Sequence, residues 1–245
     1  MILLIDIGNS RVKWATFSEG KLGVQGSATH ESWGEADWRR QIEQSGARRV
    51  LAASVATPAR NELLERACRQ AVGCAPEFVT STAMAAGVRN GYSNPAQLGV
   101  DRWLAVIGAF HRYRSSCCVV DVGTAMTVDT VDGAGRHLGG FIVPGPQLMV
   151  ASLLTGTSDL AERWSWASAP EHAGFPANTR DAIEQGCLLA LAGLLQSASD
   201  RLAERAGETP VLVLTGGAAP VLGRWITQPF ENVEDLVLQG LSHLT

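Results

Sequence analysis

The chain has 245 residues, of which 46% are hydrophobic and 18% are charged, and its formal net charge at pH 7 is −4. This composition describes a globular protein with room for one large or two small domains. No apolar run reaches the roughly 18 residues that a membrane-spanning helix needs, and no basic segment precedes the first apolar run. A slightly acidic chain also lacks the positive footprint of a nucleic-acid-binding domain. We therefore expect a cytoplasmic protein with neither a membrane nor a nucleic-acid partner.

The five cysteines show neither Cys-x-x-Cys spacing nor a nearby pair of histidines. Their number is odd, and Cys117 and Cys118 are adjacent within an apolar run. This pattern indicates reduced, buried thiols in a reducing compartment rather than disulfides or a structural zinc site.

The chain begins with a predicted β-hairpin. Residues 2–5 are an apolar run too short for a helix, which indicates a buried strand, and residues 12–17 alternate like a strand that pairs back on it. Gly8 lets the backbone between the strands come close to a ligand, and Lys13 is a point charge suited to phosphate. The carboxylate of Asp6 would repel a phosphate unless a cation lay between them. We infer a hydrated Mg²⁺ that bridges Asp6 to a nucleotide.

The rest of the first half alternates between helices and strands, which favours an α/β domain with a mixed sheet. Tyr92 lies in a segment without periodicity, where a tyrosine is ordinarily a surface residue. In chain order, the pattern predicts a helix over 32–44, a strand over 50–55, a helix over 58–70, a strand over 77–80, a loop over 87–98 and a helix over 100–113.

Asp101 stands in the first turn of the helix predicted over 100–113, where the helix dipole favours its ionised form. Its simplest interpretation is a carboxylate that stabilises the start of a helix. The irregular loop before it and the neighbouring Arg102 favour a functional site instead.

The second half of the chain opens like the first. Residues 117–120 form an apolar run that ends in Asp121-Val122-Gly123-Thr124, and an alternating strand over 126–131 follows. Aligning Asp6 with Asp121 superposes Gly8 on Gly123. Two such units, one at the start of each half, predict a duplicated domain with a boundary between residues 114 and 115.

After this second hairpin the pattern is less regular. Residues 160–178 contain Trp164 and Trp166 without periodicity, and long loops of this kind tend to be functional or to form interfaces. The Gly216-Gly217 pair is by itself a weak signal. The predicted elements are a strand over 137–143, helices over 147–154 and 180–206, with Asn178 or Thr179 as the cap of the latter, a strand over 211–214 and a closing helix over 231–244.

The chain resembles the type III pantothenate kinases over essentially its whole length. These belong to the actin, hexokinase and Hsp70-like superfamily, whose two duplicated ribonuclease H-like domains hold ATP in the cleft between them. The resemblance implies such domains over 1–114 and 115–245. It rests on Asp6-Ile7-Gly8-Asn9-Ser10, Gly99-Val100-Asp101-Arg102, Asp121-Val122-Gly123-Thr124, Gly139-Gly140-Phe141-Ile142-Val143-Pro144-Gly145 and Thr179-Arg180-Asp181-Ala182-Ile183.

The resemblance implies ATP-dependent phosphorylation of pantothenate, the first step of coenzyme A biosynthesis, by a homodimer that uses Mg²⁺ and a monovalent cation, K⁺ or NH₄⁺. It implies Asp101 as the general base and Asp121 as the ligand of the monovalent cation, although Asp121 could instead hold Mg²⁺ through water. The irregular stretch over 160–178 is expected near the twofold axis. The implied ATP-binding residues are Asp6, Ile7, Gly8, Asn9, Ser10, Arg11, Val12, Lys13 and Thr124, and those for pantothenate are Tyr92, Gly99, Val100, Asp101, Arg102 and Thr179.

Two alternatives remain open at the level of sequence. Another small-molecule kinase of the same superfamily would keep both acidic hairpins. A non-catalytic accessory or regulatory protein on this fold would not need Asp6, Asp101 and Asp121 together, so their joint presence counts against it. The chain contains neither a Walker A motif nor a protein-kinase glycine loop, which argues against those classes.

Overall fold

A computed structural model describes residues 1–154 and 174–245 of the chain. Part of the irregular stretch that we expect near a twofold axis, including Trp164 and Trp166, lies outside the described residues. The chain divides into two compact units. The first comprises residues 1–114, 135–137 and 235–245, and the second comprises residues 115–134 and 138–234.

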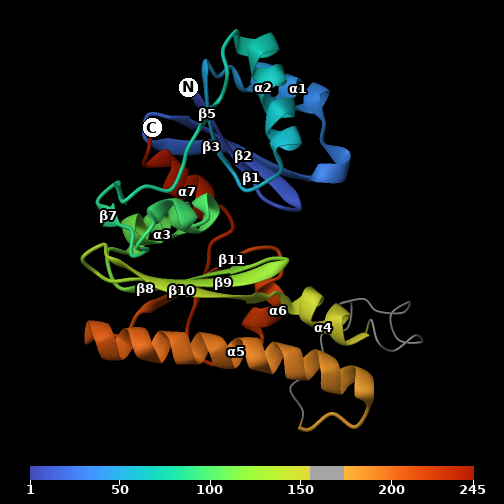
Figure 1. The fold of residues 1–245 in the computed structure, drawn as a ribbon, viewed down its shortest axis with the longest axis vertical. Helices are drawn as coiled ribbons and strands as arrows, with labels where there is room; N and C mark the ends of the chain where they lie inside the picture. Colours follow the sequence, from blue (N-terminus) through green and yellow to red (C-terminus); the bar gives the residue numbers. More distant parts are fainter. Residues whose placement is uncertain (155–173) are drawn as a thin grey trace. The chain divides into compact units, whose positions relative to one another are not determined.

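The first unit is built on a five-stranded mixed sheet in the order β3-β2-β1-β4-β5. Its first three strands form an antiparallel meander, and β4 and β5 continue the sheet in parallel to β1. Helices α1 and α2 pack against one another on this unit (Figure 1). The bounds are β1 Ile2–Ile7, β2 Arg11–Ser18, β3 Lys21–Thr29, α1 Glu35–Ser45, β4 Arg49–Ser54, α2 Pro58–Val72 and β5 Glu77–Phe78.

Alternation along β1 decides which of its side chains reach which face of the sheet. Leu3, Ile5 and Ile7 are buried in one cluster with Trp38 of α1 and Leu64 of α2. Asp6 lies between two of these positions along the strand, so its carboxylate points to the opposite face. That is the face on which helix α7 (Leu236–Ser242) contacts β1, and α7 in turn packs on helix α3 (Val100–Tyr113).

The second unit repeats this plan with a sheet in the order β10-β9-β8-β11-β12. The long helix α5 runs along this sheet (Figure 1). Its Leu188, Leu191 and Leu195 are buried in one core with Val120 and Val122 of β8. The bounds are β8 Cys117–Val122, β9 Ala125–Val131, β10 His137–Pro144, α4 Pro146–Leu154, α5 Thr179–Ala206, β11 Val211–Thr215, α6 Ala219–Gly223 and β12 Glu231–Asn232.

The two sheets therefore have the same topology. In each, the first strand is central, pairs antiparallel with the second strand and pairs in parallel with the fourth. This confirms the predicted fold class, an α/β protein with two mixed sheets flanked by helices. It also confirms both predicted strand pairs around the Asp-x-Gly turns.

The C-terminal segment differs from expectation. The predicted single helix over 231–244 is instead the short strand β12 followed by α7, and residues 235–245 belong to the first unit rather than the second. The physical reason is a close helix contact. Gly108 of α3 and Gly240 of α7 lack side chains where the other helix's backbone passes, and a Cβ at Gly108 would lie 2.5 Å from the Leu236 carbonyl oxygen.

Smaller differences concern element ends and short elements. A 3-10 turn, His30–Ser32, precedes α1. The predicted loop over 87–98 contains β7 (Val88–Arg89), which pairs with β6 (Met84–Ala85), and a second 3-10 turn, Pro95–Gln97.

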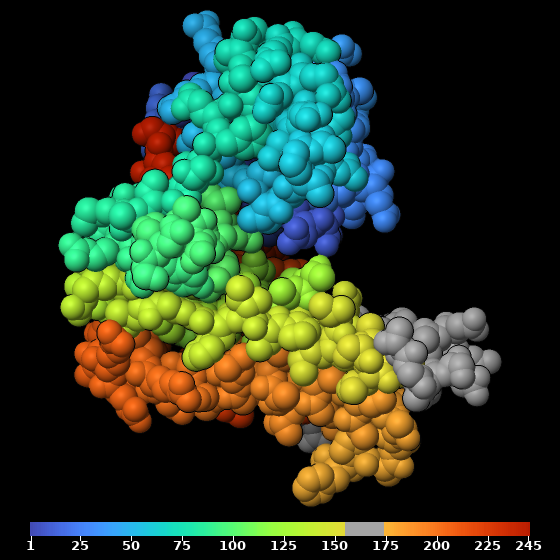
Figure 2. All heavy atoms as spheres, in the orientation of Figure 1, coloured from blue at the N-terminus to red at the C-terminus, as the bar shows by residue number. Residues whose placement is uncertain are grey.

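Within the described ranges, no helix combines the length and apolar character needed to cross a membrane. In Figure 2 the atoms of α1 and α2, coloured blue to cyan, make up one surface of the first unit.

Candidate functional site

The first acidic hairpin presents a polar loop at the end of the central strand. Asp6 is the cross-strand partner of Lys13, and Gly8 closes the turn by donating its N–H to the Arg11 carbonyl oxygen at 3.0 Å. A Cβ on Gly8 would lie 3.2 Å from that oxygen, so the tight turn favours glycine. The His30 Nε2–H donates to the Gly8 carbonyl oxygen at 2.7 Å. Within this turn Asn9 and Ser10 are exposed, so their amide and hydroxyl groups are accessible to a ligand.

The second acidic hairpin is shorter and surrounded by backbone. Asp121 pairs with Thr127, and Gly123 donates its N–H to the Ala125 carbonyl oxygen at 3.0 Å. Gly145, which follows β10, donates its N–H to the Thr124 carbonyl oxygen at 2.8 Å. Gly216, which follows β11, has a φ of +94°, and a Cβ there would collide with the Asp121 carboxylate. The Asp121 carboxylate is thus partly buried, and the backbone of Gly216 passes close beside it.

The donors around Asp121 suit a monovalent cation. They are one carboxylate and nearby backbone carbonyl groups, with Thr124 exposed beside them. Such oxygen donors, together with water, can hold a monovalent ion. A monovalent ion does not need the near-ideal octahedral geometry that Mg²⁺ demands. Among the residues that the structure describes, no three His, Cys, Asp or Glu side chains gather as a metal site.

Asp101, Arg102 and Tyr92 form a connected group in the first unit. Asp101 stands in the first turn of α3, and its Oδ1 accepts the backbone N–H of Arg102 at 2.8 Å. The Arg102 side chain is 7% exposed, and its Nη1 donates to the Tyr92 hydroxyl at 3.0 Å. Gly99 leaves room for this arrangement, since a Cβ there would lie 2.6 Å from Asp101 Oδ1. A carboxylate, a guanidinium and a phenol are thus held together at one helix start.

Thr179 is the first residue of α5 and is exposed. The cap of this helix is Asn178, whose side-chain oxygen accepts the Asp181 N–H at 2.9 Å. The capping role therefore falls to Asn178, and the Thr179 side chain remains accessible to a substrate.

The predicted site residues fall into two sets. The first unit holds residues 6–13 together with Tyr92, Gly99, Val100, Asp101 and Arg102, and the second unit holds Asp121, Thr124 and Thr179. Within the first unit, Asp6 points to the face of the sheet on which α7 packs, and α7 packs on α3, whose first turn carries Asp101.

Comparison with known proteins identifies the family. The family model for type III pantothenate kinase matches residues 2–201. The type III pantothenate kinase of Aromatoleum aromaticum is 39% identical over 242 residues, which cover 99% of this chain and 96% of that protein. The chain belongs to the type III pantothenate kinase family.

Solved structures with little sequence identity share the fold. A Baf family transcriptional activator from Campylobacter jejuni has a TM-score of 0.61 at 21% identity, covering 98% of this chain and 94% of that one. The ROK hexokinase of Thermus thermophilus has a TM-score of 0.51 at 13% identity, covering 98% and 96%. Because the identities are this low, these likenesses show the actin-like fold alone, and the family assignment rests on the closer relatives.

His137 joins the group around Tyr92 in this member of the type III pantothenate kinase family, although sequence reasoning missed it. Its imidazole is 2% exposed and stacks on the Tyr92 ring, with ring centroids 5.9 Å apart and an interplanar angle of 19°. The Gly91 N–H donates to His137 Nδ1 at 3.4 Å. In the sequence, His137 is only the first residue of a strand, and no local pattern links it to Tyr92.

Three of the five cysteines of this kinase family member are unsuited to covalent catalysis. Burial raises the pKa of the thiols of Cys68, Cys117 and Cys118 to about 12, so they stay protonated and weakly nucleophilic. All five cysteines are free, as the sequence predicts, but Cys74 is exposed rather than buried.

Proposed function

We propose that the protein transfers the γ-phosphoryl group of ATP to the primary hydroxyl of pantothenate, the first step of coenzyme A biosynthesis. The observation that carries the proposal is the group at the start of α3. There a carboxylate in the first helical turn adjoins a buried arginine whose side chain is bound to a tyrosine hydroxyl. Family membership supplies the substrate.

Asp101 is the general base. The α3 dipole favours its ionised form, and an ionised carboxylate can accept the proton of an alcohol as the alcohol attacks phosphorus. Arg102 is the anchor for the acid end of pantothenate, because a guanidinium binds a carboxylate through two parallel hydrogen bonds. Its contact with Tyr92 fixes the side chain before substrate arrives. Gly99 and Val100 border this site, and Thr179 is the proposed contact from the start of α5.

The first hairpin binds the phosphates of ATP. Its residues supply backbone N–H groups, short polar side chains and two cationic side chains, and they are Asp6, Ile7, Gly8, Asn9, Ser10, Arg11, Val12 and Lys13. Thr124 of the second hairpin adds a hydroxyl. Mg²⁺, held by Asp6 through water, and K⁺ or NH₄⁺, held by Asp121, would neutralise phosphate charge when bound. Since phosphoryl transfer passes through a loose transition state, positioning and charge neutralisation account for most of the catalysis.

The proposed active form is a homodimer in the cytoplasm. Thr179 supports the first part, because a residue at the start of α5 is exposed and accessible to the substrate of a neighbouring copy. Five free cysteines suit a reducing compartment.

The decisive experiment compares Asp101→Asn with Asp37→Asn. Both aspartates stand in the first turn of a helix in the first unit. Loss of a general base should lower kcat by about 10²- to 10⁴-fold in Asp101→Asn with ATP affinity nearly unchanged, whereas Asp37→Asn should keep its rate. Turnover is measured as pantothenate-dependent ADP release. An Asp101→Asn enzyme with most of its rate would remove Asp101 as the base.

The substrate is tested separately with a panel of alcohols and labelled ATP. Preferred transfer to pantothenate supports the proposal. Preferred transfer to a sugar would indicate a different kinase of the same superfamily, and absence of transfer to any alcohol would indicate an accessory protein.

A further inference from the structure

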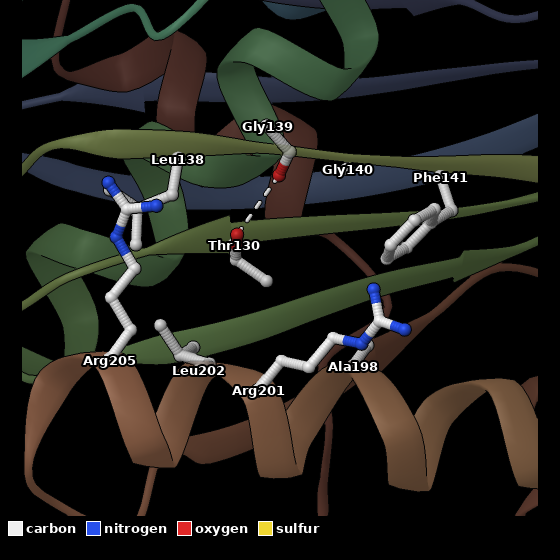
Figure 3. A pocket seen from close by; sticks show the side chains of 9 residues that line it. All are labelled: Thr130, Leu138, Gly139, Gly140, Phe141, Ala198, Arg201, Leu202 and Arg205. Atoms are coloured by element: carbon white, nitrogen blue, oxygen red, sulfur yellow. Dashed lines mark hydrogen bonds between the residues drawn. The ribbon is translucent and has the colours of Figure 1, made fainter.

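The second unit contains a groove between its edge strand and its long helix. Its volume is about 240 Å³, and Figure 3 shows the side chains that line it. In Figure 2 the yellow-green atoms of β10 border the orange atoms of α5 at this surface. The groove lies apart in sequence from both acidic hairpins and from α3. Its lining residues are Thr130, Leu138, Gly139, Gly140, Phe141, Ala198, Arg201, Leu202 and Arg205.

Two glycines shape the strand side of the groove. Gly139 has a φ of +101°, and a Cβ on Gly140 would collide with the Val128 carbonyl oxygen, so neither position readily accepts a side chain. The Thr130 hydroxyl donates to the Gly139 carbonyl oxygen at 3.0 Å and holds the distorted strand in place. The result is a wall of bare backbone at the edge of the sheet. The roles proposed above for the hairpins and α3 do not require this glycine pair.

Two arginines form the opposite wall. Arg201 and Arg205 are one turn apart on α5, and Figure 3 shows both side chains extending toward the strands, with the Arg201 guanidinium on the side of Phe141. Both residues are exposed, and no carboxylate in the described part of the chain forms an ion pair with either. Like charges at this spacing repel one another along a helix. The helix therefore bears a small electrostatic cost that a bound anion would relieve.

We propose that this groove binds a small phosphomonoester with a compact apolar group. Figure 3 shows the Arg205 guanidinium beside Leu138 and the Arg201 guanidinium toward Phe141, at opposite ends of the groove. These exposed side chains would turn toward one another to hold the phosphate through charge-assisted hydrogen bonds. Leu138, Phe141 and Leu202 would cover the apolar part. A volume of about 240 Å³ lies below the roughly 300–1,000 Å³ of pockets for drug-sized ligands. The site therefore suits a molecule of the size of phenyl phosphate rather than a whole nucleotide.

The test is isothermal titration calorimetry of the full chain with phenyl phosphate. Excess MgADP is present in a second series, so that any binding at the hairpins is blocked. The wild-type chain should bind one molecule in both series, at least tenfold more tightly than it binds benzoate. Arg201→Ala with Arg205→Ala should weaken this affinity at least tenfold, and the charge-preserving pair Arg201→Lys with Arg205→Lys should give an intermediate value.

The matched control is Arg39→Ala with Arg40→Ala, which removes the same charge from adjacent exposed positions on α1. It should change the affinity less than twofold. Equal weakening by both pairs would mean that net charge alone attracts the anion, and binding that disappears with MgADP would place it at the hairpins. Either result, or no binding at all, would overturn the proposal. Because the readout is binding rather than turnover, it stands whether or not the chain phosphorylates pantothenate.

Discussion

The two acidic hairpins place an aspartate at the same point of the central strand but surround it with different groups. Between Ile7 and its cross-strand partner Val12 the first loop has four residues, whereas between Val122 and Met126 the second has three. The first loop carries an amide, a hydroxyl and a guanidinium, from Asn9, Ser10 and Arg11. The second is approached closely by the backbone at Gly145 and Gly216.

This difference suggests that a duplicated element has taken two roles. A loop rich in exposed donors suits phosphate oxygens, which vary in position during transfer. A carboxylate held close to backbone, as Asp121 is beside Gly216, suits an ion that stays in place throughout. The same strand end would then serve the reacting group in one unit and a fixed counter-charge in the other.

The largest predicted effect is on cation dependence, and it tests whether Asp6 and Asp121 have different roles. We expect the rate to fall by at least about 100-fold when K⁺ or NH₄⁺ is replaced by Na⁺, a loss similar to that of one charge-stabilising group in an active site. Asp121→Asn should be slow in all three ions, while Asp6→Asn should keep its preference for K⁺ and instead require more Mg²⁺. Initial rates over a matrix of the two cation concentrations measure both responses. Equal rates in K⁺ and Na⁺ would discard the assignment of Asp121.

The second prediction concerns the backbone around Asp121. Gly216→Ala should lower the free energy of unfolding by about 2–5 kcal/mol, because left-handed strain of about 1–2 kcal/mol adds to an overpacking cost of about 1–3 kcal/mol. Gly217 has open space around its Cβ position, and its φ lies outside the left-handed region. Gly217→Ala should therefore stay within about 1 kcal/mol of the wild type. Urea unfolding compares the two, and similar losses would show that the approach to Asp121 is not what requires glycine.

The hairpins were predictable because their signals are local. A short apolar run, an aspartate, a glycine and an alternating strand fix the turn and the face of each side chain within about fifteen residues. The helix that carries Asp101 was predictable for the same reason, and it spans Val100–Tyr113, the predicted range. The resemblance to a family added roles for residues that the pattern alone left open.

Long-range packing was not predictable. The leucine spacing over 236–244 suggested a helix, but the contact of Gly108 with α7 that returns this helix to the first unit involves residues more than 100 positions apart. The stack of His137 on Tyr92 likewise joins positions far apart in the chain. The His137 contact is possible because residues 135–137, although they lie in the second half of the chain, belong to the first unit.

The smallest predicted effect concerns the stack of His137 on Tyr92. It tests whether His137 contributes to pantothenate binding by the first unit. An aromatic pair contributes about 0.5–1.5 kcal/mol, which corresponds to about a 2- to 12-fold change in binding. His137→Asn should raise the KM for pantothenate by that factor and leave kcat and the KM for ATP nearly unchanged. His137→Phe, which retains a ring to stack on Tyr92, should restore most of the loss.

The control for His137 is His243→Asn, which breaks the other histidine stack of the first unit, where the His111 and His243 ring centroids lie 3.8 Å apart. It removes a ring of the same size without touching Tyr92, so the KM for pantothenate should stay at the wild-type value. If His243→Asn and His137→Asn raise the KM values for pantothenate and ATP alike, His137 stabilises the unit as a whole. A rise confined to pantothenate and to His137→Asn would instead mean that the imidazole positions Tyr92, and through its hydroxyl the guanidinium of Arg102, before the substrate binds.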